Sequence, residues 1–196
     1  MKNCILIGVG GQGTILASKL IAQAAMDKGL QARTAETIGM AQRGGSVLSH
    51  VRIGDDIYSP LVPFHSADIV IGFEPAEAVR AIPYLKKDGT VIVSKKAIMP
   101  VNTSLSGTGY NPEKMLSYLK HHVNHLVIVD TDSICQLCGS TKVVNTSLLG
   151  AAIACNVLDI TIEDIENTIR KNLAEKYIEM NLRALRAGAK AITMGE

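Results

Sequence analysis

The chain has 196 residues, of which 47% are hydrophobic and 19% are charged, and its 20 basic residues nearly balance its 18 acidic ones. A chain of this length and apolar content is expected to form one domain with a hydrophobic core, which excludes a disordered protein. The net charge of +2 gives no basic footprint for nucleic acid, and no apolar run approaches the roughly 20 residues that a membrane span needs.

Short apolar runs alternate with amphipathic ones along most of the chain. Strands are predicted over residues 3–7, 31–37, 68–73, 90–94 and 126–130, and helices over 13–28, 75–85 and 111–124. Two strand-like runs, 46–53 and 57–58, flank Gly54-Asp55-Asp56, a turn sequence that predicts a β-hairpin. Helices are then predicted over 143–158, 161–171 and 175–192, with a capping box at Thr161 and Asp164.

This order of elements predicts a single α/β domain over residues 1–196. We expect a Rossmann-like, mostly parallel sheet with flanking helices, a β-hairpin insertion and a helical C-terminal third. The short apolar run at residues 4–7 leads into glycines and not into a cleavage site, and four scattered cysteines are too few for a disulfide framework. A cytoplasmic protein is therefore expected.

A glycine-rich loop, Gly8-Val9-Gly10-Gly11-Gln12-Gly13, follows the first predicted strand and precedes a helix. In this context the G-x-G-x-x-G pattern is typical of a nucleotide or phosphate site, because free N–H groups and the helix dipole attract an anion. The alternative is that the glycines only make a tight turn and allow close packing. Glu36 ends the second predicted strand, near the position of a ribose-binding acid, although an acid there is often simply solvated.

A second glycine-bearing loop follows the second predicted strand and contains Arg43. In an open parallel sheet this loop would lie beside the first one, at the carboxyl edge. An arginine flanked by glycines can clamp a phosphate or carboxylate or anchor a partner protein, and the alternative is an ordinary exposed arginine. The predicted ligand-binding residues are Gly8, Gly10, Gly11, Gln12, Gly13, Glu36, Gln42, Arg43 and Gly44.

Other residues of types that often bind metals or act in catalysis form no predicted site in this sequence. Cys135 and Cys138 make a lone C-x-x-C, which offers two ligands where zinc or iron–sulfur sites use about four. His121 and His125 share a helical face with no carboxylate to complete a ligand set. Neither a Ser-His-Asp order nor a nucleophile elbow is present. The sequence therefore predicts no catalytic residue and no metal ligand.

Taken together, GVGGQG at 8–13, Glu36-Thr37 and MAQRGGSVLSHVRIG at 40–54 resemble the gamma-type subunits of 2-oxoacid:ferredoxin oxidoreductases. The stretches SADIVIGFEPAEAVR at 66–80 and VVNTSLLGAA at 143–152 agree with this family. The resemblance spans nearly the whole chain, and the motif sequences are most similar to those of the small subunit in the indolepyruvate branch of the family.

The resemblance implies a subunit of an enzyme that oxidatively decarboxylates arylpyruvates such as indolepyruvate to acyl-CoA and reduces ferredoxin. It places thiamine diphosphate, Mg and the iron–sulfur clusters in a large partner subunit. This chain would bind no cofactor tightly, with coenzyme A (CoA) as the candidate contact. Three alternatives stay open: a gamma subunit for pyruvate, 2-oxoglutarate or branched-chain 2-oxoacids, a stand-alone nucleotide-binding module, and a free-standing dehydrogenase.

Overall fold

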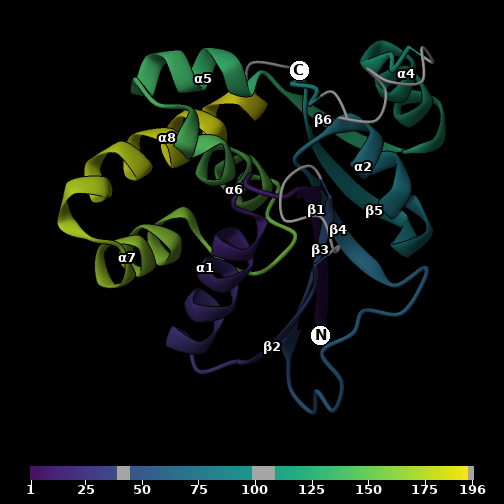
Figure 1. The fold of residues 1–196 in the computed structure, drawn as a ribbon. Coiled ribbons are helices and arrows are strands. Elements are labelled where there is room, and N and C mark those ends of the chain that lie inside the picture. The colour runs from purple at the N-terminus through teal and green to yellow at the C-terminus, as the bar shows by residue number, and fades with distance from the viewer. Residues whose placement is uncertain (39–44, 99–108, 194–196) are drawn as a thin grey trace.

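The described part of the chain contains one six-stranded sheet in the order β2-β3-β1-β4-β5-β6 (Figure 1). The computed structural model describes residues 1–38, 45–98 and 109–193. Strands β1, β4, β5 and β6 are parallel to one another, and β3 lies antiparallel between β1 and β2. This arrangement confirms the predicted, mostly parallel sheet. The strands are β1 (Lys2–Val9), β2 (Gln31–Ile38), β3 (Ser46–Gly54), β4 (Ala67–Gly72), β5 (Leu85–Ser94) and β6 (His125–Val129).

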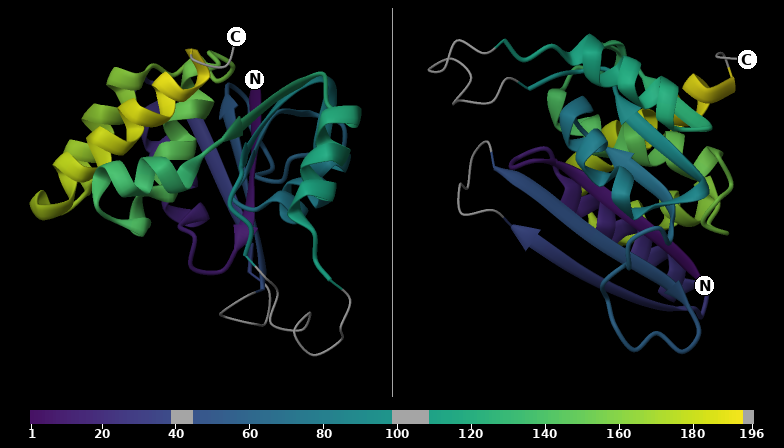
Figure 2. Two further views of the ribbon diagram at one scale, coloured as in Figure 1. Left: turned by 90° about the horizontal axis from the view of Figure 1, so that it is seen from above. Right: turned by 90° about the vertical axis from the view of Figure 1, so that its right-hand side faces the viewer.

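Helices cover the two faces of this sheet and make three layers (Figure 2). On one face lie α1 (Thr14–Asp27), α5 (Thr131–Cys138), α6 (Val144–Ala154), α7 (Ile162–Asn172) and α8 (Glu175–Thr193). On the other lie α2 (Pro75–Ala81) and α4 (Pro112–His122), and the 3₁₀ turns are η1 (Ile82–Tyr84) and η2 (Thr141–Val143). Within the described ranges, no helix combines the length and apolarity that a membrane crossing requires.

The central strand β1 supplies both hydrophobic cores. Cys4 and Leu6 pack with the helices on the α1 face, whereas Ile5 and Ile7 pack with those on the α2 face. All four side chains are buried. The sequence of a strand that is buried on both faces is a continuous apolar run. This pattern is why the sequence predicted β1.

Two predicted helix starts are confirmed at their capping residues. The Thr161 hydroxyl accepts a hydrogen bond from the Asp164 N–H at 3.2 Å, and the Asp164 carboxylate accepts one from the Thr161 N–H at 2.8 Å. At α4, the Asn111 side chain accepts from the Lys114 N–H at 3.2 Å, and Pro112 takes the first helical position. Each cap satisfies N–H groups that the helix leaves open, worth about 1 kcal/mol.

The prediction that residues 57–58 form the second strand of a hairpin is wrong. Strand β3 pairs with β2 on one side and with β1 on the other, for eight residue pairs each. A two-residue strand cannot compete with two ladders of this length. Instead Ile57 is buried and its carbonyl accepts a hydrogen bond from Arg33 Nε at 2.5 Å. The antiparallel hairpin of the fold is therefore formed by β2 and β3.

The predicted helix over 75–85 is shorter than expected. It ends at Ala81 and passes into the 3₁₀ turn η1, which contains Pro83. Proline has no N–H to continue the helical hydrogen-bond pattern. Strand β5 also begins earlier than predicted, at Leu85, with an irregular register against β4 between Ala67 and Ile69.

Helices α6 and α8 touch through their backbones. A Cβ atom placed on Gly150 would lie 2.0 Å from the Leu185 carbonyl oxygen, and one on Gly188 would lie 1.9 Å from the Ser147 carbonyl oxygen. Real Cβ atoms do not approach oxygen this closely. The two glycines therefore set the spacing of this helix pair.

His50 on β3 is expected to make stability depend on pH. The side chain is 4% exposed, its Nδ1 accepts a hydrogen bond from the Val62 N–H at 3.2 Å, and burial lowers its pKa. The unfolded chain binds this proton near pH 6.5 while the folded one does not, so the free energy of unfolding should fall as the pH drops below about 6.5. In urea unfolding at several pH values, His50→Gln should flatten this dependence, because glutamine keeps an acceptor and does not titrate. Equal pH dependence in the two proteins would contradict the assignment.

Candidate functional site

The carboxyl ends of the parallel strands bring the glycine loop together with three other segments. Residues 10–13 follow β1, residues 73–74 follow β4, residues 95–96 follow β5, and Asp130 follows β6. In the sheet, β2 and β3 lie on one side of β1, whereas β4, which comes later in the chain, lies on the other side. Open α/β sheets bind ligands at such a reversal of strand order.

Two glycines of the loop are required by its packing. Gly13 has φ +83° and is the N-cap of α1, and a Cβ there would lie 2.8 Å from Asn145 Nδ2. A Cβ on Gly8 would lie 2.7 Å from both Gln12 Oε1 and Phe73 Cβ. The loop is therefore enclosed between the end of β4 and the start of α6.

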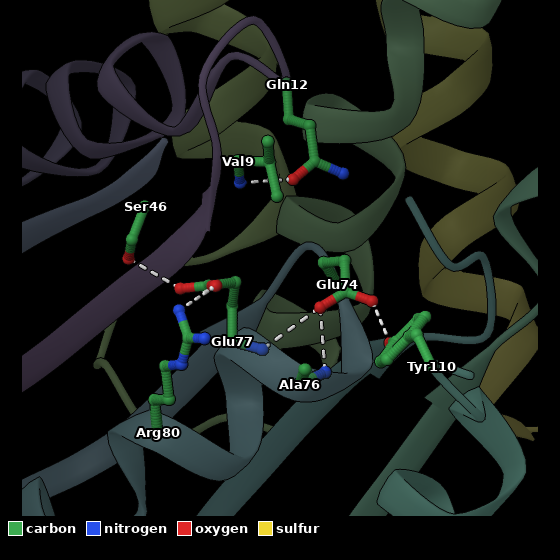
Figure 3. A network of polar contacts seen from close by, with 8 residues as sticks. All are labelled: Val9, Gln12, Ser46, Glu74, Ala76, Glu77, Arg80 and Tyr110. Carbon is green, nitrogen blue, oxygen red and sulfur yellow. Dashed lines mark hydrogen bonds and ion pairs between the residues drawn. The ribbon is translucent and has the colours of Figure 1, made fainter. Parts of the chain in front are cut away.

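The Gln12 side chain joins the glycine loop to the ends of β1 and β4, and Figure 3 shows its bond to Val9. Its Oε1 accepts a hydrogen bond from the Val9 N–H at 2.6 Å, and its Nε2 donates one to the Phe73 carbonyl at 2.8 Å. The Gly10 N–H donates to the Gly45 carbonyl at 2.9 Å. The Gln12 carboxamide thus holds the loop in place, and a contact of Gln12 with a ligand stays a prediction.

The N-terminus of α1 faces a cavity of about 580 Å³. Gly13 has no side chain to cap this helix, and the first turn of α1 contains no acid. By contrast, side chains cap the starts of α2, α4, α5 and α7. A helix start of this kind attracts anions through its N–H groups and its dipole. The cavity is lined by Gly10, Gly11, Gln12, Gly13, Leu16, Lys96, Ile98, Thr141, Lys142, Val144 and Asn145.

Two lysines and a buried amide line the same cavity. Lys96 Nζ lies 2.6 Å from Asp132 Oδ1, and this hydrogen bond raises the pKa of Lys96. Lys142 is exposed at the rim. Asn145 is only 4% exposed, and its Oδ1 accepts a hydrogen bond from the Thr146 N–H at 2.8 Å. Its Nδ2 lies against Gly13 and can donate toward the cavity.

A second polar network lies at the start of α2, beside the glycine loop (Figure 3). Glu74 is 2% exposed, and one carboxylate oxygen accepts from the N–H groups of Ala76 and Glu77 at 2.8 and 3.1 Å. The other oxygen accepts a hydrogen bond from the Tyr110 hydroxyl. Burial and this bond raise the pKa of Tyr110. Glu74 therefore joins α2 to the segment that leads into α4.

The next carboxylate of α2 binds the start of β3. Glu77 is 6% exposed and accepts hydrogen bonds from the Ser46 hydroxyl at 2.5 Å and from Arg80 at 2.6 Å. Figure 3 shows Glu74 immediately before this short helix and Glu77 in its first turn. This helix therefore holds two separate segments at the same edge of the sheet.

The structure does not bring Glu36 to the glycine-loop cavity. Strand β3 separates β2 from β1, and Glu36 is opposite Ser49 of β3. The Glu36 side chain is exposed, and its Oε1 accepts a 3.5 Å hydrogen bond from the Ser18 hydroxyl. The spacing rule for a ribose-binding acid assumes that the first two strands are neighbours, and here they are not.

Gln42, Arg43 and Gly44 lie outside the described residues. The residue that follows them, Gly45, accepts the hydrogen bond from Gly10, which places the end of the second loop beside the first. The functional roles of these three residues stay predictions.

The C-x-x-C pair lies in the short helix α5. Cys135 is buried, and burial raises its pKa, which opposes the reactive thiolate form. In residues 1–38, 45–98 and 109–193, no three His, Cys, Asp or Glu side chains form a group that could hold a metal ion.

Lys96, Lys142, Asn145 and Tyr110 are among the cavity and network residues that the sequence did not predict. They lie 83 or more positions beyond the glycine loop, after the ends of later strands or at the starts of helices. Only the rule that ligands bind at the carboxyl ends of parallel strands could have selected the lysine after β5.

Comparison with known proteins decides the family. Residues 3–191 match the family model described as pyruvate ferredoxin/flavodoxin oxidoreductase. The chain belongs to this family. It is 39% identical over 188 residues to the indolepyruvate oxidoreductase subunit IorB of Archaeoglobus fulgidus, which covers 95% of this chain and 92% of that protein. The pyruvate/ketoisovalerate oxidoreductases common subunit gamma of Pyrococcus abyssi is 28% identical over 181 residues, 91% of this chain and 90% of that one.

Solved structures of the oxidoreductase family share the fold. The keto/oxoacid ferredoxin oxidoreductase gamma subunit of Geobacter sulfurreducens has a TM-score of 0.73 at 22% identity and covers 100% of both chains. The 2-oxoglutarate:ferredoxin oxidoreductase of Magnetococcus marinus has a TM-score of 0.72 at 16% identity, covering 100% of this chain and 31% of that one. In the second enzyme the same fold is therefore one part of a longer chain.

Proposed function

We propose that this chain is the small subunit of an indolepyruvate-type 2-oxoacid:ferredoxin oxidoreductase. The observation that carries the substrate class is the 39% identity to IorB over nearly the full length of both proteins, against 28% to the pyruvate/ketoisovalerate gamma subunit. The complex oxidatively decarboxylates arylpyruvates to acyl-CoA and reduces ferredoxin. The isolated chain is expected to be inactive.

The cofactors of this reaction are assigned to a larger partner subunit. When bound there, thiamine diphosphate with Mg²⁺ supports decarboxylation, and iron–sulfur clusters carry the electrons to ferredoxin. This chain supplies the carboxyl edge of its sheet, where Gln12 and Glu74 hold the glycine loop and the start of α2 in fixed positions. That edge is proposed to form one wall of the CoA-binding region of the complex.

The glycine-loop cavity fits the anionic part of CoA. The N-terminus of α1 supplies N–H groups and the positive end of a helix dipole. Lys96 and Lys142 add positive charge, and Asn145 Nδ2 adds a donor at the cavity wall. Three kinds of donor suited to phosphate thus line one cavity: the N–H groups of a helix start, lysine side chains and the Asn145 amide.

Replacing Lys142 by glutamine is expected to raise the KM of the complex for CoA by about tenfold and to leave kcat nearly unchanged. A charge-assisted hydrogen bond is worth about 1.5–3 kcal/mol, and tenfold corresponds to about 1.4 kcal/mol. Steady-state kinetics with CoA as the varied substrate measures the change. Lys120→Gln, on the far face in α4, is the matched control and should change neither constant. An unchanged KM in Lys142→Gln would remove Lys142 from the site.

A second candidate is a gamma subunit that serves pyruvate or 2-oxoglutarate. It is favoured by the 28% identity to the Pyrococcus abyssi subunit and by the fold shared with the 2-oxoglutarate enzyme. A stand-alone nucleotide-binding module is distinguished by a simple observation, namely micromolar binding of NAD(H), FAD or an adenine nucleotide to the isolated chain.

An anaerobic pull-down of the tagged chain from its own host tests the proposed function. The eluate is assayed for CoA-dependent reduction of a viologen dye with indolepyruvate, phenylpyruvate, pyruvate and 2-oxoglutarate in parallel. Activity with the arylpyruvates alone is the expected result. Activity only with pyruvate or 2-oxoglutarate would move the substrate class. Recovery of the chain without a larger iron–sulfur protein and without activity would reject the subunit assignment.

A further inference from the structure

Arginine side chains hold the loop at residues 55–66, which links β3 to β4 at the end of the sheet opposite the glycine loop (Figure 1). Arg33 Nε donates to the Ile57 carbonyl at 2.5 Å. Arg52 Nη1 donates to the carbonyls of Ser59 and Leu61 at 3.0 and 3.4 Å. We call this segment the 55–66 loop.

Further contacts fix the second half of the 55–66 loop. The Val62 N–H donates to His50 Nδ1 at 3.2 Å, and the His65 N–H donates to the Pro83 carbonyl at 2.9 Å. The loop conformation is thus determined along its length before any partner binds. A preorganised loop loses little further conformational entropy on association, which favours tight binding.

The 55–66 loop directs large apolar side chains into solvent. Tyr58 is 89% exposed, Leu61 55% and Phe64 63%, and Met1, whose sulfur contacts Arg52, is 60% exposed. At roughly 200 Å² for a large side chain these four expose about 500 Å². A standard interface takes about 800 Å² from each partner, of which about 57% is apolar. The exposed area of these four side chains is therefore close to the apolar area that one partner contributes to a standard interface.

A groove of about 620 Å³ lies beside these side chains. Helix α1 packs on one face of β2 and β3, whereas α2 packs on β1, β4 and β5 at the other face. Figure 2 (right) shows β2 and β3 with no helix in front of them on this side. The groove runs over that open face from Phe64 to Thr37 and Leu48, near the carboxyl edge.

We propose that the 55–66 loop and the open face of β2 and β3 form the surface on which the larger, catalytic subunit docks, with apolar pockets on that subunit for Tyr58 and Phe64. This inference rests on the proposed function, because it needs the larger partner. The groove favours that occupant over a second copy, since it leads toward the edge that bears the glycine loop and a large partner can cover both. In the 2-oxoglutarate enzyme, moreover, the same fold is 31% of one chain.

The test uses the large subunit, purified from the complex, and this chain as wild type and as Tyr58→Ser/Phe64→Ser. Both residues are exposed, so the double variant is expected to fold, which circular dichroism checks. Truncating an interface anchor costs 2 kcal/mol or more, or about 30-fold in Kd, so the pair should weaken binding by at least about 100-fold. Excess variant subunit should restore the wild-type kcat with an unchanged KM for CoA. Tyr177→Ser, an exposed tyrosine of α8, is the matched control.

Three results would overturn the inference. One is wild-type affinity of the double variant for the large subunit. The second is a dimer of the isolated wild-type chain in sedimentation, together with a double variant that is monomeric and still binds the large subunit normally. The surface would then bind a second copy of this chain. The third is a failure of the wild-type chain to bind the large subunit. That result would also reject the proposed function, and it would be found before any variant is compared.

Discussion

Replacing Gly188 by alanine is expected to lower the free energy of unfolding by about 3 kcal/mol, the upper end for overpacking a well-packed contact. A Cβ atom at this position would lie 1.9 Å from the Ser147 carbonyl oxygen and 2.7 Å from its carbon. Backbone atoms cannot move aside as a side chain can, so α6 and α8 must separate. At an ordinary helical position the same substitution stabilises by about 1 kcal/mol, so the sign of the effect is diagnostic.

Thermal unfolding of the purified protein measures this effect. For a chain of this size, 3 kcal/mol corresponds to a fall in Tm of roughly 10 °C. Gly150→Ala enters the same contact from the other helix, 2.0 Å from the Leu185 carbonyl oxygen, and should give a similar loss. The double variant should lose less than the sum, because the first substitution already separates the helices. A rise in Tm for either single variant would contradict the close backbone contact.

Replacing Gly13 by alanine is expected to reduce the activity of the complex by roughly 100-fold, the cost of misplacing a binding element by about 1 Å. The new Cβ would meet Asn145 Nδ2 at 2.8 Å, and the backbone would keep a φ of +83°. The side chain of Asn145 or the start of α1 must then move, and the glycine-loop cavity changes shape. Steady-state kinetics of the reconstituted complex measures the loss, which should include a raised KM for CoA.

Gly29→Ala is the matched control for this substitution. Gly29 has the same φ of +83°, and a Cβ there would meet no atom within 4 Å. It should cost only the left-handed backbone penalty of about 1–2 kcal/mol in stability and leave kcat and the KM for CoA unchanged. Equal activity losses in the two variants would show that backbone strain, and not the contact with Asn145, explains the result.

The parts of the fold that the sequence predicted well depend on local physics. The capping box of Thr161 and Asp164 needs only residues three positions apart, and the buried strands of the parallel sheet are continuous apolar runs. The partner of β3 depends instead on which strands lie beside it in space. The turn residues at 54–56 therefore favoured the wrong hairpin, although β3 itself was predicted within a residue.

The candidate site was predicted only in part for a similar reason. The glycine pattern located the loop at the carboxyl end of β1, where the structure has it. It could not show that the Gln12 carboxamide bonds to the backbone of Val9 and Phe73, because that depends on how close β4 lies. The number of residues between the loop and Glu36 predicted that Glu36 lies near the loop, whereas β3 lies between the strand of Glu36 and β1 in the sheet.

Helix α8 is connected to the glycine-loop cavity through α6. The Thr146 hydroxyl, one residue after Asn145, donates a buried hydrogen bond of 2.5 Å to Asn181 Oδ1 of α8. Together with the glycine contacts farther along, this bond packs α8 closely against α6, which carries Asn145 in its first turn. A substitution that changes how α8 packs on α6 is therefore expected to shift Asn145 in the cavity wall, although α8 itself does not line the cavity.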